Sequence, residues 1–215
     1  MAGTMPHAIF IETNADGSGG VAAYAAELPG CATFAPSDDE AAAALPRRVE
    51  SFCAWLRDGG EEAPTFLGDN WYEVERAAAA STDGGLERAA FSLDELSPSD
   101  AEFERWLRWL ELAREELAAA IDVAGEGVDL AVLAAIATQD DRLAQVLGAR
   151  AGSDAATGSD AGAVADPVDR LYAFRDRLTD ALAAAGPTVD GVRRAVRLAI
   201  ADDLRAAERL REAGS

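Results

Sequence analysis

Three charged residues in the C-terminal half lie on or beside apolar stripes of predicted helices. Asp140 lies between Ile136 and Leu143 on an apolar stripe. Asp203 flanks a later stripe, and Arg114 interrupts an earlier one. A buried carboxylate needs a cationic partner. The sequence leaves two interpretations open: a remnant polar pocket for a cation or small ligand, or one structural Arg–Asp bridge with the other acid exposed. No metal or other cofactor is predicted.

Nucleophilic and acid–base chemistry has few candidates. His7 is the only histidine, and it lies where we expect a surface strand, so no Ser/His/Asp or Cys/His arrangement is credible. Cys31 and Cys53 are interpreted as packing residues, since no evident basic neighbour of Cys31 lowers its thiol pKa. Adjacent acids such as Asp202 and Asp203 diverge by about 100° on a helix and do not share a substrate. We therefore predict no catalytic residue.

The charge balance limits the partners. The chain has 39 acidic against 19 basic residues and a net charge of −20. Affinity for a phosphate backbone needs dense positive charge, so nucleic acid and anionic membranes are not expected partners. With no signal peptide and no apolar run of membrane-spanning length, the sequence predicts a cytoplasmic protein.

Alternation of apolar residues predicts strands in the first third of the chain. The expected strands are residues 7–13, 21–28 and 31–35, and Pro29-Gly30 forms a tight turn between the last two. Ser37 caps a helix that closes near Gly59, which we expect Pro46 to kink or divide. Residues 71–79 are interpreted as a fourth strand, with a short helix as the alternative.

Helical periodicity dominates after a linker at residues 83–96. Four amphipathic helices are expected, beginning near Ser97–Ser99, Asp129, Asp166 and Thr188, and they predict a four-helix bundle over residues 97–215. The Gly/Ser/Ala/Asp-rich residues 149–166 are expected to form a mobile loop. The predicted fold class is α+β, with a first domain over residues 5–82.

The N-terminal domain resembles the HicB family of antitoxin-type domains. The resemblance rests on Ala23-Tyr24 leading into Glu27-Leu28-Pro29-Gly30-Cys31, and on the acid-led helix after Ser37. It implies a small β-β-β-α-β domain with a partial ribonuclease-H-like fold, but not a nuclease. The predicted contact surface for a protein partner comprises Tyr24, Leu28, Pro29, Gly30 and Cys31.

The C-terminal half resembles the DinB-like bundles, a family of metal-binding proteins. Residues 110–117 (LELAREEL) look like their first helix and residues 132–137 (VLAAIA) like their second. That family binds a divalent metal through three histidines, and the matching positions here are Ala135, Ala199 and Asp203. The resemblance therefore implies a bundle that has lost its metal site.

Together these observations predict a non-enzymatic binding or regulatory protein, in which a HicB-like module is fused to a degenerate DinB-like bundle. One alternative is a metal- or thiol-dependent transferase or hydrolase of the DinB-like class. The other is a toxin-neutralising antitoxin. Sheet edges invite pairing, so a homodimer is expected.

Overall fold

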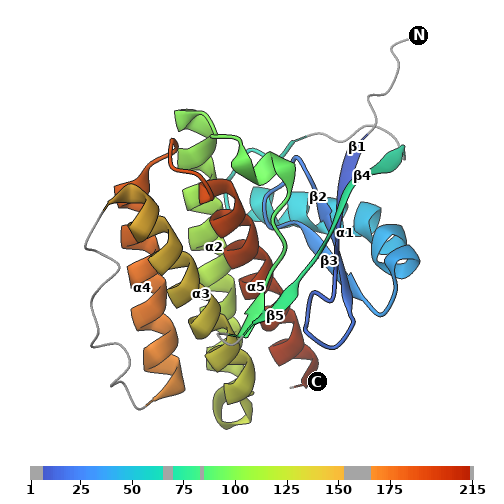
Figure 1. Cartoon of the computed structure of the whole chain (residues 1–215). Helices are drawn as coiled ribbons and strands as arrows, with labels where there is room; N and C mark the ends of the chain where they lie inside the picture. The colour runs from blue at the N-terminus through green and yellow to red at the C-terminus, as the bar shows by residue number, and fades with distance from the viewer. Residues whose placement is uncertain (1–6, 65–69, 83–84, 153–165, 214–215) are drawn as a thin grey trace. The chain divides into compact units, whose positions relative to one another are not determined.

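The computed structural model describes residues 7–64, 70–82, 85–152 and 166–213 and has a mixed α+β fold (Figure 1). The chain divides into two compact units, residues 1–93 and 94–215. The first contains a small sheet and one long helix, and the second is helical. The predicted α+β class is confirmed. None of the described helices is long and apolar enough to cross a membrane.

The first unit is built on a four-stranded sheet in the order β3-β2-β1-β4. The strands are β1 (His7–Thr13), β2 (Val21–Ala25), β3 (Ala32–Ala35) and β4 (Trp71–Ala78). The first three pair antiparallel, whereas β4 pairs parallel to β1. The strand interpretation of residues 71–79 is therefore confirmed over Trp71–Ala78. Ile9, Phe10 and Ile11 are all buried, because both faces of β1 are covered.

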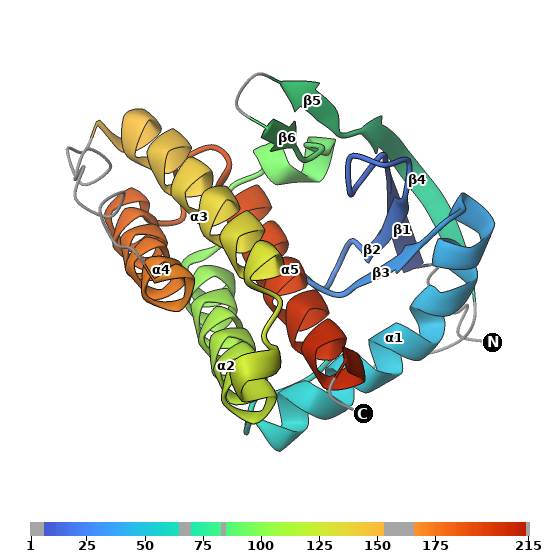
Figure 2. The ribbon, with the colours of Figure 1, turned by 90° about the horizontal axis from the view of Figure 1, so that it is seen from below.

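Helix α1 (Asp38–Asp58) covers one face of this sheet (Figure 2). Ser37 caps it as predicted, accepting a hydrogen bond from the Glu40 backbone N–H. The helix runs through Pro46 without a break, so the expected division there is wrong. The buried stripe continues across Pro46 from Leu45 to Val49, and this packing offsets the hydrogen bond that proline removes.

The other face of the sheet is covered by residues that the sequence assigned to a linker. After the short hairpin of β5 (Ala80–Thr82) and β6 (Gly85–Glu87), the chain returns to the sheet. Phe91 stacks on Phe10 of β1 with ring centroids 4.7 Å apart, and it meets the Tyr24 ring edge-on at 6.0 Å. The first unit thus extends to Leu93 rather than ending at residue 82.

The Pro29-Gly30 turn forms as predicted. The Cys31 backbone N–H donates to the Leu28 carbonyl at 2.9 Å, and Gly30 has a φ of 87°. Proline followed by a residue of positive φ is the arrangement of a type II turn, which favours glycine at its third position. The turn fixes the antiparallel pairing of β2 with β3.

The 3₁₀ segment η1 (Ser92–Glu95) contains the last two residues of the first unit and the first two of the second. The four α-helices of the second unit are α2 (Asp100–Ala124), α3 (Leu130–Ala151), α4 (Pro167–Ala185) and α5 (Val192–Ala213), with η2 (Gly125–Gly127) after α2. The starts of α2 to α4 follow the predicted caps, Ser99, Asp129 and Asp166. The start of α5 does not. Residues 188–191 form turns, and Gly191 has a φ of 90°, so the helix begins four residues after Thr188.

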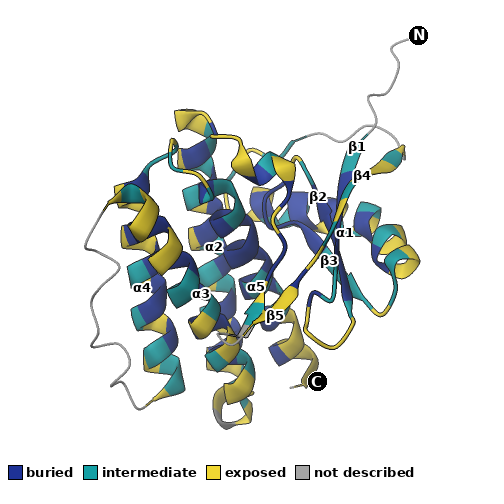
Figure 3. Ribbon diagram, viewed as in Figure 1, coloured by how far each residue is buried: buried dark blue, intermediate teal, exposed yellow. Residues whose placement is uncertain are grey.

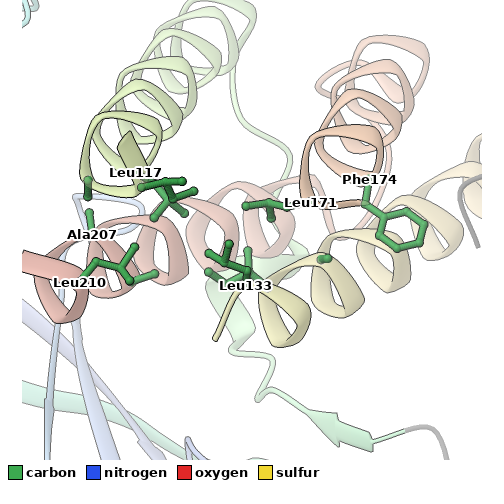
Figure 4. Close-up of a cluster of buried hydrophobic side chains, with 11 residues drawn as sticks. Leu117, Leu133, Leu171, Phe174, Ala207 and Leu210 are labelled. Carbon is green, nitrogen blue, oxygen red and sulfur yellow. The ribbon is translucent and has the colours of Figure 1, made fainter. Parts of the chain in front are cut away.

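The four helices share an apolar core. Helix α3 packs on α4, α2 packs on α5, and α3 also contacts α5. Buried side chains from all four converge near one end, among them Leu117, Leu133, Leu171 and Leu210 (Figure 4). Figure 3 shows buried and exposed residues alternating along these helices, as their amphipathic sequences require. Most of the predicted mobile loop, residues 153–165, lies outside the described residues.

Candidate functional site

A buried carboxylate in the first unit has all the partners it needs. Glu12, at 0% exposure, accepts hydrogen bonds from Arg88 Nε at 3.0 Å and Nη2 at 2.9 Å, and from the Ala89 N–H at 2.6 Å. The Tyr24 hydroxyl donates to it at 2.7 Å. Burial raises the pKa of Glu12, but the Arg88 charge and these hydrogen bonds outweigh it and hold the pKa below its usual value. This cluster is satisfied, and we regard it as structural.

The second unit buries charge differently. Each of its four α-helices contributes one charged residue to a layer across the bundle: Arg114 from α2, Asp140 from α3, Arg175 from α4 and Asp203 from α5. We call these residues the four-charge layer. Asp140, Arg175 and Asp203 are 2–3% exposed, and Arg114 is half-buried. All four interrupt apolar helix faces, so the helices bring them together when the core forms.

Arg175 is the centre of the layer. Its Nη2 donates to Asp203 Oδ1 in a buried ion pair. Its Nε lies 3.9 Å from Asp140 Oδ2, which is beyond hydrogen-bond distance. Arg114 reaches the same region, where Nη1 donates to the Thr179 hydroxyl and Nη2 donates to the Arg175 carbonyl at 3.1 Å.

Three guanidinium nitrogens in the layer are buried without a hydrogen-bond partner among the described residues: Nε and Nη1 of Arg175 and Nε of Arg114. Buried polar atoms are almost always hydrogen-bonded, since leaving one unsatisfied costs about 1–3 kcal/mol. The second unit therefore holds N–H donors to which no residue in the described part of the chain is hydrogen-bonded. The Glu12 cluster shows that this chain can satisfy a buried carboxylate in full.

The two carboxyl groups of the layer share one environment but differ in their bond to Arg175. Burial and the neighbouring Asp203 charge raise the pKa of Asp140 to about 8, against the opposing effect of Arg175 and Arg114. Burial also raises the pKa of Asp203, although Arg175 is bonded to it directly. A proton held by this pair resides on Asp140, because Asp203 has the direct bond to the guanidinium.

The sequence predicted part of this layer. Asp140 and Asp203 are both buried, so the interpretation with one exposed acid is wrong. Arg114 lies near the two carboxylates, but the residue bonded to Asp203 is Arg175, which sequence reasoning missed. The signal was present, because Arg175 lies four residues after Leu171 and three before Leu178 on the buried stripe of α4.

The predicted contact surface in the first unit lies at buried positions. Tyr24, Leu28, Pro29, Gly30 and Cys31 are all buried, with exposures of 0–1% for Tyr24, Leu28 and Cys31. The Tyr24 side chain is bonded to Glu12 and packs against Phe91. At this degree of burial, the five residues offer little surface to a protein partner.

The three positions matched to metal-binding histidines do not share one environment. Ala199 and Asp203 are buried, whereas Ala135 is exposed. Over the residues that the structure describes, no group of three or more His, Cys, Asp or Glu side chains is placed to hold a metal ion. What the layer offers to a ligand is guanidinium N–H donors.

We compared the chain with protein families, curated proteins and solved structures. No protein-family model matches the chain, and no curated protein or solved structure is significantly similar to it.

Proposed function

We propose that the protein is a non-enzymatic cytoplasmic binding or regulatory protein whose helical unit binds a small ligand at the four-charge layer. The observation that supports this is the set of unused donors on Arg175 and Arg114. A ligand that accepts hydrogen bonds from them offsets the cost of burying them unpaired. As components of this proposal, the first unit is a HicB-like module and the second a degenerate DinB-like bundle.

Catalysis has less support than binding. A protonated Asp140 has the property of a general acid, but no activated nucleophile accompanies it in the layer. The Thr179 hydroxyl donates to the Arg175 carbonyl at 2.9 Å and accepts a hydrogen bond from Arg114, so both of its roles are occupied.

The thiols are also poorly placed for the alternative of a thiol-dependent transferase or hydrolase. Cys31 and Cys53 are buried, and burial raises the pKa of the Cys53 thiol. A thiol with a raised pKa forms little of the nucleophilic thiolate at neutral pH. The antitoxin alternative has less support because the chain is acidic and the predicted contact residues, Tyr24, Leu28 and Cys31 among them, are buried.

The proposal is tested by screening small solutes against the full chain, with hydrogen exchange of α3, α4 and α5 as the measurement. A ligand of the native state slows exchange in the helices that hold it. We expect at least one solute to protect these helices, and the protection to be lost in Arg175→Met.

Arg197→Met is the matched control for that variant. Arg197 is also a buried arginine of the second unit, but it is bonded to Asp94 through Nε at 3.2 Å and Nη2 at 2.6 Å, away from the layer. Protection should persist in this variant. The proposal fails if no solute protects the helices, or if purified untagged protein retains a stoichiometric transition metal. Light scattering of the same preparation tests the proposed homodimer.

A further inference from the structure

We propose that the ligand of the four-charge layer is a small monovalent anion, of the size of chloride or formate, which binds together with a proton on Asp140. The anion accepts hydrogen bonds from Arg175 and Arg114. This inference rests on the proposed function, because it names the ligand class of the same site.

The donor set determines the sign of the ligand. The unused atoms are Nε and Nη1 of Arg175 and Nε of Arg114, and all of them are N–H donors on cationic groups. A guanidinium has no acceptor to offer. Two guanidiniums repel a cation. The ionised carboxylate of Asp203 is not available to a cation either, because it is already bonded to Arg175. The Nε–H and Nη1–H groups of Arg175 point in different directions, so a small anion accepts from one of them together with Arg114 Nε.

The charge of the layer supports the same sign. Two guanidiniums and the Asp203 carboxylate leave one positive charge when Asp140 carries a proton. The raised pKa of Asp140, about 8, keeps that proton in place at neutral pH. A monovalent anion then brings the buried layer to neutrality, which is the condition under which buried charge is least costly.

The packing around the layer limits the size of the ligand. Arg175 lies between Leu171 and Leu178 on α4, and both leucines are fully buried. On α3, Asp140 lies between the buried Ile136 and Leu143. A larger organic acid would have to displace these apolar side chains, whereas chloride or formate displaces far less volume.

Proton and anion binding are linked. The charged groups that face Asp140 are Arg114 on α2, Arg175 on α4, and Asp202 and Asp203 on α5. An added anion disfavours the ionised form of Asp140 and raises its proton affinity. When Asp140 loses its proton, the layer becomes neutral without a ligand. Anion affinity should therefore fall about tenfold per pH unit once the pH exceeds the pKa of Asp140.

The experiment titrates the full chain with sodium chloride, bromide, nitrate or formate in a background of sodium gluconate, whose bulky anion holds ionic strength constant. Hydrogen exchange of α3, α4 and α5 reports binding, and ³⁵Cl NMR line broadening reports chloride directly. We expect saturable protection, lowered about tenfold or more in Arg175→Met and retained in Arg197→Met. Arg175→Lys, which keeps the charge and loses the planar donors, should bind with intermediate affinity.

Asp140→Asn provides a readout that a merely structural layer would not affect. The amide imitates the protonated carboxyl, so this variant should bind the anion with an affinity that no longer falls above pH 8. Comparing the affinities of the halides with that of formate shows whether the site prefers an inorganic anion or a carboxylate. Arg175-dependent protection by a cation or a neutral solute would overturn this inference and leave the proposed function standing. Protection by no solute at all, with water as the only occupant, would overturn both.

Discussion

Glu12 in the first unit and Asp140 in the second are both removed from water, at 0% and 3% exposure. Their pKa values nevertheless shift in opposite directions, below the usual value for Glu12 and to about 8 for Asp140. Arg88, Ala89 and Tyr24 bond Glu12 directly, whereas the nearest cationic atom to Asp140 is Arg175 Nε at 3.9 Å. Burial alone therefore does not set the direction in which the pKa of a carboxyl group shifts. The hydrogen bonds around it do.

The largest effect is expected at Arg88. Arg88→Met leaves Glu12 buried without its cation, which should lower the free energy of unfolding of the first unit by about 3–5 kcal/mol. Urea unfolding followed by two-dimensional NMR resolves the two units and measures the loss. The double variant Arg88→Met/Glu12→Gln should recover part of it, since no charge is left unpaired. A loss below about 1 kcal/mol would mean that Glu12 is not held as we describe.

Asp203→Asn should cost less, about 2 kcal/mol, although it also removes the partner of a buried arginine. The second unit has a spare carboxyl, and loss of the Asp203 charge lets Asp140 ionise beside Arg175. The same NMR measurement gives the stability, and the carboxyl ¹³C chemical shift of Asp140 gives its pKa. That pKa should fall. If the pKa of Asp140 stays unchanged and the free energy of unfolding falls as much as in Arg88→Met, the two clusters do not differ as we infer.

The pH dependence of stability should have opposite signs in the two units. Asp140 has a pKa of 3.8 when unperturbed and about 8 when folded. Between these values the folded state binds more protons than the unfolded state. The free energy of unfolding of the second unit should therefore fall as pH rises from about 4 to about 8, by up to ~1.4 kcal/mol per pH unit.

Glu12, whose folded pKa is lowered, gives the first unit stability that is lost as pH falls below the ordinary glutamate range. Urea unfolding at a series of pH values, followed by NMR, separates the two trends. Asp140→Asn should flatten the trend in the second unit only. A second unit that instead gains stability between pH 5 and 8 would show that Asp140 is ionised when folded.

The smallest effect is expected at an exposed guanidinium, which provides the baseline for both clusters. Arg76 on β4 pairs with Glu73 at 2.7 Å and with Asp38, and the three side chains are about 40% exposed. Arg76→Met should change the stability of the first unit by less than about 1 kcal/mol, because solvent screens such pairs. At low and at moderate salt, the urea midpoint of Arg76→Met should stay close to that of the unmodified protein. The midpoint of Arg88→Met should be clearly lower at both salt concentrations.

Local patterns in the sequence predicted the elements well. The caps at Ser37, Ser99 and Asp129 and the Pro29-Gly30 turn are formed by neighbouring residues, so their signals are contained in short stretches. The inward position of Asp140 also followed from its spacing to Ile136 and Leu143. What local patterns identify is the face on which a residue lies.

Partners that are distant in the sequence were not predicted. Arg88 lies in a stretch without periodicity, and its bond to Glu12 crosses 76 residues, so the segment was interpreted as a linker. Arg175 had the spacing of a core residue, but nothing in α4 indicates that Asp203 faces it from α5. Choosing between Arg114 and Arg175 requires the packing of the helices, which the periodicity of one helix does not contain.

The distance along the chain between Glu12 and Arg88 has a consequence for synthesis on the ribosome. Strand β1 emerges before its parallel neighbour β4, which follows more than 50 residues later, and Arg88 follows β4. Until Arg88 has left the exit tunnel, burying the Glu12 carboxylate is unfavourable in free energy, because its cationic partner is missing. A nascent chain that ends at Thr82, where the sequence suggested the domain would close, should remain unfolded. Release of seven or more further residues should let the sheet form.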